Sequence, residues 1–185
     1  KIFFSNQHPY CLINKNKWID FCKRKIKNSK VKIIKKKVED KNSKFFVDEK
    51  LVEGDYFFDS RNVASCKNIL LQHFIGLTIE TNDNKFDPST VILMDFRCDQ
   101  SRGLHFIYFI PFSENKALIE STLFSKNVEN RKFYLSAINS YLKKFFNIKF
   151  FKVIKEENGI IPMHYMNFFQ ENSVSIGTRG GATKP

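Results

Sequence analysis

The chain of 185 residues has no CxxC pair, and its four cysteines, Cys11, Cys22, Cys66 and Cys98, are widely spaced. Its four histidines are equally scattered, and none forms a metal-binding pair at helical spacing. These absences argue against a zinc site and suit a reducing compartment, where cysteine behaves as a small apolar residue. Apolar runs stay well short of the roughly 20 residues that span a bilayer, so any membrane contact is expected to be peripheral.

Low-complexity linkers and internal repeats are also missing from the sequence. Hydrophobic residues make up 42% and charged residues 27%, which is typical of a globular domain and excludes a disordered chain. The length allows one ordinary domain with a real core. The sequence opens on Lys1 without Met or a signal peptide and stops in a Gly-rich turn at residues 180–185, so we expect a piece of a longer protein.

The sequence has few acidic residues: 19 Asp and Glu compared with 31 Lys and Arg, which gives a net charge of +12. Such an excess favours an anionic partner, either nucleic acid or an anionic membrane surface. It is equally what AT-rich coding produces, because Lys, Asn, Ile and Phe are all abundant, and the lysines would then be solvated surface. The densest basic run, residues 23–37, lacks interleaved aromatics and matches no nucleic-acid motif.

Hydrophobic periodicity predicts two helices. Asn14 is expected to cap the first, which continues to about Asn28, and Asn127 the second, which continues to about Phe146. The buried stripe of the second helix is expected to contain Phe133, Ala137, Ile138, Tyr141, Leu142 and Phe145. Strands are expected at residues 31–38, 44–47, 56–59, 72–81, 91–96, 104–110, 117–123, 150–154 and 174–177, with a turn and a short apolar piece at 158–163. Short connections favour antiparallel neighbours among the strands from 91 to 123.

Glu120 is the candidate that carries chemistry, because it is an acid within an apolar and aromatic meander. On a strand it shares a face with Leu118 and Thr122, and it meets either Phe106, Tyr108 and Ile110 or the opposite set, His105, Ile107 and Phe109. In a pocket, desolvation would raise its pKa, so that it could hold and donate a proton beside rings that stabilise a cation. The alternative is an exposed Glu, paired with Lys116.

Three further positions are candidates. Asp95 would share one proton with Glu120 if both faced the same pocket, or it pairs with Arg97 at the rim. Asp59 ends an apolar strand, where it either faces a ligand or braces a turn with Arg61. The small residues after residue 177 would let backbone amides approach an anion closely.

The order and spacing of several motifs resemble the flavin-dependent lycopene β-cyclase family. The motifs are QHFIG at residues 72–76, FDP at 86–88, LMDF at 93–96, FIYFIPFS at 106–113, IEST at 119–122, NGIIPM at 158–163 and IGTRGGA at 176–182. Four features depart from the family pattern: Asn62 replaces the Gly of its Asp-x-Arg-Gly, Ser121 replaces a frequent acid, the Gly-rich dinucleotide fingerprint is absent, and so is the Ser-Thr-Gly-Tyr that follows the final Pro.

The resemblance implies acid-catalysed closure of the linear ends of lycopene into β-ionone rings, using reduced FAD without net redox and NAD(P)H as the reductant. It implies that Glu120 is the catalytic acid, with Asp95 second, and that the flavin lies near Thr178, Arg179, Gly180, Gly181, Ala182 and Asp59. Because such a substrate lives in the bilayer, we expect the basic residues to hold a cytoplasmic enzyme peripherally against anionic lipids. No nucleic acid is expected as a partner, because no groove-reading motif is present.

The expected fold class is α/β with an α+β substrate domain. Residues 1–66 would belong to a Rossmann-type flavin domain that is incomplete here, residues 67–153 to an antiparallel substrate sheet with a helix, and residues 154–185 to a truncated return to the flavin domain. Two other functions stay open: a related flavoenzyme, such as an isoprenoid reductase or a hydroxylase, and a basic nucleic-acid-binding module.

Overall fold

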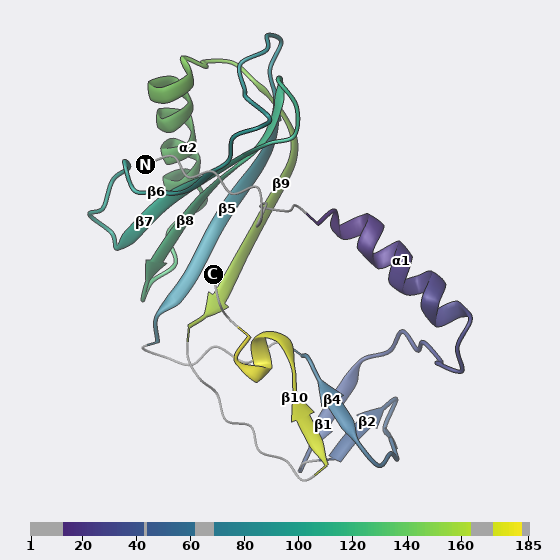
Figure 1. The fold of residues 1–185 in the computed structure, drawn as a ribbon. Coiled ribbons are helices and arrows are strands. Elements are labelled where there is room, and N and C mark those ends of the chain that lie inside the picture. Colours follow the sequence, from purple (N-terminus) through teal and green to yellow (C-terminus); the bar gives the residue numbers. More distant parts are fainter. Residues whose placement is uncertain (1–12, 43, 62–68, 164–171, 183–185) are drawn as a thin grey trace, which may run out of the picture. The chain divides into compact units, whose positions relative to one another are not determined.

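The computed structural model describes residues 13–42, 44–61, 69–163 and 172–182 (Figure 1). It divides into two compact units, Lys1–Glu53 and Gly54–Pro185. Asn62, which was noted as replacing a glycine, lies outside the described residues.

The first unit contains helix α1 (Lys15–Lys27) and an antiparallel sheet of β1 (Val38–Lys41), β2 (Lys44–Val47) and β3 (Lys50–Leu51). The predicted cap of α1 is confirmed, because the backbone amide of Lys17 donates to Asn14 Oδ1 at 3.1 Å. The strand expected at residues 31–38 is wrong, since β1 begins only at Val38. The apolar side chains of the preceding segment are exposed, so it gains no burial that would hold it in a sheet.

A five-stranded antiparallel sheet dominates the second unit. Its strands are β6 (Ile92–Asp95), β7 (Leu104–Pro111), β8 (Lys116–Ser125), β5 (Leu71–Glu80) and β9 (Lys152–Pro162), in that order across the sheet. The predicted meander of three antiparallel strands is therefore confirmed. β5 is inserted between β8 and β9, a long-range pairing that no short connection indicates.

β9 corrects the expectation of two short pieces separated by a turn at residue 158. One strand runs through Asn158 and Gly159, because almost every residue from Lys152 to Pro162 pairs with β5. Cross-strand hydrogen bonds and packing outweigh the weak strand preference of Asn and Gly. The expected domain boundary after residue 153 falls inside this strand, while the assignment of whole segments to a flavin domain stays a prediction.

Helix α2 (Arg131–Phe146) lies along one face of the sheet (Figure 1). Its cap lies three residues later than predicted: the Asn130 side chain accepts from the backbone amide of Phe133 at 3.1 Å, whereas the Asn127 carbonyl accepts from Ser125 Oγ at 2.6 Å. Its buried residues are Tyr134, Ile138, Tyr141 and Leu142; of the predicted stripe, Phe133, Ala137 and Phe145 are only partly buried.

The core forms between α2 and the sheet. Ile75, Ile107, Ile119 and Leu123 point to the helix from three neighbouring strands and are almost fully buried. Burial of each such side chain stabilises the fold by about 1.5–3 kcal/mol. Because side chains alternate along a strand, the residues between these four face the opposite side of the sheet. Strand alternation thus separates a packed face from a second face that can carry chemistry.

A two-stranded parallel sheet pairs β4 (Phe57–Asp59) with β10 (Ser173–Ser175), and the 3-10 helix η1 (Gly177–Gly180) follows β10. The predicted strands at 56–59 and 174–177 correspond to these elements. Their pairing joins two segments that lie more than a hundred residues apart in the chain.

Candidate active site

Glu120 occupies one rung that crosses four strands. Its Cα pairs with Tyr108 on β7 and with Gly76 on β5, and Gly76 pairs in turn with Glu157 on β9. All four residues are on the face opposite α2, since their sequence neighbours, such as Ile107 and Ile119, are core residues. The register that sequence alone leaves open is thereby settled: Glu120 meets Phe106, Tyr108 and Ile110.

The Glu120 carboxyl group is partly buried and has a defined hydrogen bond. Thr122 Oγ1 donates to Glu120 Oε1 at 2.7 Å, so this oxygen is an acceptor. Burial raises the pKa of Glu120 to about 7; the Thr122 hydrogen bond acts against the shift, and the charge of Glu157 adds to it. A carboxylic acid with such a pKa is protonated in a large fraction of molecules near neutral pH and can donate its proton.

An aromatic cluster shares the face of Glu120. Phe106, which is fully buried, contacts Phe96, Tyr108 and Phe124 at ring-centroid distances of 5.5, 5.1 and 6.0 Å. Phe74 on β5 continues the aromatic surface over Gly159: a Cβ on Gly159 would lie 2.7 Å from its ring. Aromatic faces attract cations by about 2 kcal/mol when water is excluded, so this surface suits an apolar substrate that becomes positively charged.

Gly76 keeps the centre of the rung open. A Cβ built on Gly76 would lie 3.3 Å from Glu120 Oε2 and 3.3 Å from the Cγ atom of Glu157. Both side chains therefore bend toward a position that only glycine leaves vacant. The Oε2 atom, which is not the acceptor of the Thr122 bond, is the oxygen directed to this space.

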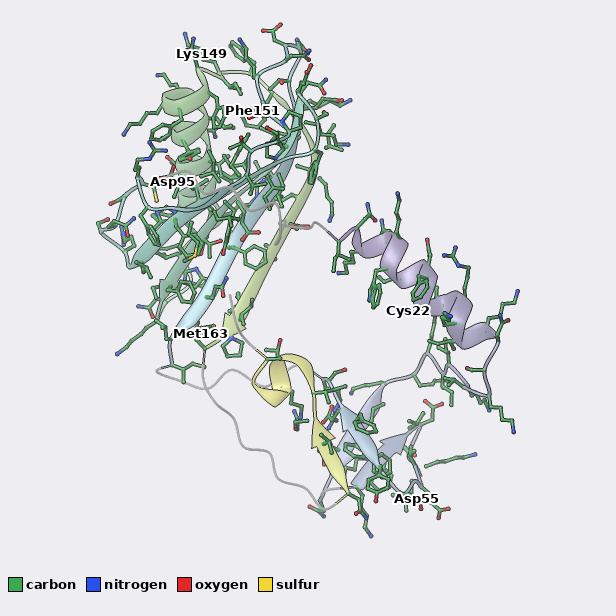
Figure 2. The ribbon with its side chains drawn as sticks, viewed as in Figure 1. Cys22, Asp55, Asp95, Lys149, Phe151 and Met163 are labelled. Carbon is green, nitrogen blue, oxygen red and sulfur yellow. The ribbon has the colours of Figure 1, made fainter. Side chains whose placement is uncertain are left out.

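Asp95 lies on the other face of the sheet, beside α2 (Figure 2). Tyr141 OH donates to Asp95 Oδ2 at 2.5 Å, and Arg97 Nη2 donates to the same oxygen at 2.6 Å. The guanidinium of Arg97, followed by the Tyr141 hydroxyl, holds the pKa of Asp95 well below its usual range. The structure thus separates Asp95 from Glu120, and the shared proton considered for the two acids is not supported by their positions.

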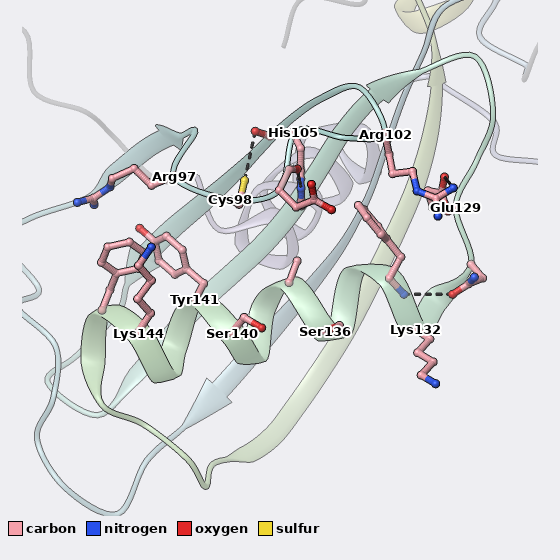
Figure 3. A pocket seen from close by; sticks show the side chains of 15 residues that line it. Arg97, Cys98, Arg102, His105, Glu129, Lys132, Ser136, Ser140, Tyr141 and Lys144 are labelled. Carbon is pink, nitrogen blue, oxygen red and sulfur yellow. Dashed lines mark hydrogen bonds and ion pairs between the residues drawn. The ribbon is translucent and has the colours of Figure 1, made fainter.

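A hollow of about 1020 Å³ lies between α2 and the segment that connects β6 to β7 (Figure 3). Its lining includes four cationic side chains, Arg97, Arg102, Lys132 and Lys144. His105 closes its floor through hydrogen bonds with Ser121 Oγ and the Asp99 carbonyl, both at 2.8 Å. This hollow is on the α2 face, so it does not contain the Glu120 carboxyl group.

The predicted cofactor residues form a second cluster. Asp59 is buried, accepts from Arg61 Nε at 2.9 Å, and lies 2.9 Å from Arg179 Nε. The alternative in which Asp59 braces its own turn with Arg61 is thus confirmed, and Asp59 also meets the turn after β10. A ligand-facing role of Asp59 stays a prediction. The amides of Gly180, Gly181 and Ala182 donate to carbonyls within that turn, to Ile176, to Thr178 and to Gly177 respectively. A Cβ at Gly180 would lie 2.4 Å from the Ser175 carbonyl oxygen, which explains glycine there.

Sequence reasoning missed the roles of Thr122, Gly76 and Glu157 around the candidate acid. Thr122 was detectable, because it follows Glu120 at a spacing of two on the same strand. Gly76 and Glu157 belong to motifs recognised in the sequence, but their meeting depends on the pairing of β5 with both β8 and β9.

Within the described part of the chain, no cluster of three or more His, Cys, Asp or Glu side chains could hold a metal ion. Neither α1 nor α2, the α-helices of that same part, has the length and apolar character needed to cross a membrane.

Comparison with known proteins gives two partial likenesses. A 76-residue segment is 34% identical to the lycopene beta-cyclase of Paracoccus sp. (strain N81106 / MBIC 01143), covering 40% of this chain and 19% of that protein. The fold resembles the crystal structure of a geranylgeranyl bacteriochlorophyll reductase-like protein from Thermoplasma acidophilum, with a TM-score of 0.53 and 13% identity. That match covers 78% of this chain and 40% of the other, so each likeness extends over less than half of the relative.

The family whose sequence profile matches is described as "Lycopene cyclase protein", and the match runs over residues 15–185, nearly the whole chain. The motifs that build the Glu120 face and the turn after β10 all fall inside that range. The chain therefore belongs to the lycopene cyclase family.

Proposed function

We propose that this chain carries the proton-donating site of a lycopene β-cyclase, an enzyme that closes linear carotenoid ends into β-ionone rings. The observation that carries the proposal is the partly buried Glu120 carboxyl group, which lies opposite Tyr108 on an aromatic sheet face. Its burial there raises its pKa to about 7. Membership of the lycopene cyclase family supports a carotenoid substrate. The named relative from Paracoccus supports the β form of the ring.

The donation step requires one acid and one cation-stabilising surface. Glu120 transfers its proton from Oε2 to a carbon of the terminal double bond, while Thr122 keeps Oε1 as an acceptor. The positive charge that forms on the substrate is attracted to aromatic rings on the same face, such as the partly exposed Tyr108. Attack by a neighbouring double bond closes the ring, and loss of a different proton restores neutrality, so no electron is gained or lost overall.

The residues proposed for the flavin are Asp59 and the turn formed by Thr178, Arg179, Gly180, Gly181 and Ala182. One observation fits such a group: these residues converge at the carboxyl ends of the parallel strands β4 and β10, the edge at which open α/β sheets bind ligands. When bound, reduced FAD would supply an electron-rich ring that stabilises positive charge on the substrate, with NAD(P)H as the source of its electrons.

The test of the function is to express the complete enzyme in bacteria that accumulate lycopene and to separate the pigments by chromatography. We expect β-carotene, or the product with one closed ring, with the mass of lycopene unchanged. A product two or more hydrogens heavier would identify a reductase of related build, and an oxygenated product would identify a hydroxylase. Either result would overturn the proposal.

Peripheral attachment to the cytoplasmic face of a membrane is part of the same proposal, because the substrate dissolves in lipid and the net charge is +12. We expect the complete enzyme to float with anionic vesicles in a density gradient and to do so less as salt rises. Equal flotation with neutral vesicles would assign the attachment to apolar contacts and contradict the electrostatic account.

A further inference from the structure

Glu157 lies two strands from Glu120 without a side chain between them. Both residues pair with the intervening Gly76, one from β9 and the other from β8. The vacant Cβ position at Gly76 is 3.3 Å from Glu120 Oε2 and 3.3 Å from Glu157 Cγ, so the two acidic side chains approach each other over the glycine. A bulkier residue on β5 would separate them.

The other charged side chains on this face also interact electrostatically with the Glu120 carboxyl group. Lys155, two residues from Glu157 on β9, donates to Glu157 Oε2 at 2.8 Å and offsets part of its charge. β7 contributes Tyr108 at the rung itself. Lys116 on β8 and Glu80 on β5 pair with each other four positions along the strands from Glu120 and Gly76, and so they are more distant. Glu157 is therefore the closest charged group aligned with Glu120 on this face among the described residues.

We propose that Glu157 is a positioning residue, which keeps the proton on Glu120 by opposing the appearance of a second carboxylate across Gly76. The inference rests on the proposed function, in which Glu120 is the acid. The charge of Glu157, whose side chain is held in place by Lys155, makes loss of the Glu120 proton less favourable, while the opposite charge of Lys155 limits the effect. Burial raises the pKa of Glu120, and the charge of Glu157 raises the same pKa further.

Substitutions of Glu157 and of Lys155, both on β9, should then shift the pH profile of ring formation in opposite directions. A rate that needs protonated Glu120 is constant at low pH and falls above the pKa of the acid. We expect Glu157→Gln to move the alkaline limb down by about half to one pH unit, lowering the rate at pH 8 roughly three- to tenfold. Lys155→Gln should move the limb up, and the double variant should return it close to the wild-type position.

Glu156→Gln is the matched control, because Glu156 is adjacent in sequence but faces α2, where Arg131 Nη2 donates to it at 2.6 Å. It should leave the alkaline limb in place. An unmoved limb in both Glu157→Gln and Lys155→Gln, or shifts in the same direction, would overturn the inference.

The experiment also separates this inference from the proposed function. Wild-type enzyme that forms no ring, or Glu120→Gln enzyme that forms rings normally, would refute the function itself. An active wild type, an inactive Glu120→Gln variant and unmoved limbs in the β9 variants would refute only the role of Glu157. If Glu157→Gln fails to fold, the upward shift predicted for Lys155→Gln decides the question.

Discussion

Replacing Glu120 with glutamine in the complete enzyme is expected to lower the rate of ring formation by about 10²–10⁴-fold, the usual contribution of a general acid. Glutamine keeps the shape of the side chain and an oxygen that accepts from Thr122, but its amide is no proton donor of comparable acidity. β-Carotene formed per folded molecule, measured by chromatography, gives the loss directly.

The same substitution should not unfold the protein. Because the pKa of Glu120 is raised in the folded state, to about 7, wild-type stability is greatest below pH 4 to 5 with respect to this group and declines as pH rises toward 7. Glutamine removes that decline, so the variant should be at least as stable as wild type at pH 8 in urea denaturation. Glu156→Gln serves as the control for activity. Retention of more than about a tenth of the wild-type rate by Glu120→Gln would remove Glu120 from the acid role.

Replacing Asp95 with asparagine is expected to lower the free energy of unfolding at pH 7 by about 1.5–3 kcal/mol, the usual value of a hydrogen bond to a charged group. The carboxylate side chain is only 6% exposed and joins Arg97 to Tyr141 of α2. Ring formation per folded molecule should not change, because Asp95 is on the face opposite Glu120. Urea denaturation and the rate measured on the same preparation test both halves of this expectation.

The effect of Asp95→Asn should depend on pH in a defined direction. Arg97 holds the pKa of Asp95 below its unfolded value, so the stabilisation is fully present above about pH 4 and is lost as pH falls further. The difference between the two proteins should therefore shrink in acid. Asp83→Asn, which alters an exposed pair with Lys85, is the control and should change stability by less than about 0.5 kcal/mol. A stable Asp95→Asn enzyme that forms no rings would instead make Asp95 a second catalytic acid.

Local patterns were sufficient to predict most of the elements. The caps and apolar spacing of α1, the alternation in β5, β7 and β8, and the short connections of the meander are properties of contiguous residues. They failed where a distant strand decides the outcome: Asn158 and Gly159 indicate a turn, yet pairing with β5 holds them in β9. The later start of α2 has a local cause, because Asn127 and Asn130 both precede the helix and either can cap one.

The candidate acid was identified from its setting, but its surroundings were not. Strand alternation places Thr122 beside Glu120 from the sequence alone. Which face of β7 meets Glu120, and whether Asp95 joins it, depends on register and on the side of the sheet that α2 covers. A shift of one residue in the pairing of β7 with β8 would place the opposite set of β7 side chains beside Glu120. The sequence of β8 alone therefore does not determine the neighbours of Glu120.

The central claim, that Glu120 keeps its proton in a large fraction of molecules near neutral pH, is tested most directly by titrating its carboxyl carbon. The complete enzyme labelled with ¹³C at glutamate carboxyl groups would be followed by NMR from pH 4 to 9, with the Glu120→Gln spectrum identifying the signal. The account predicts a midpoint near pH 7. A midpoint at the ordinary value for glutamate, about 4.3, would mean that an ionised carboxylate occupies this face and would contradict it.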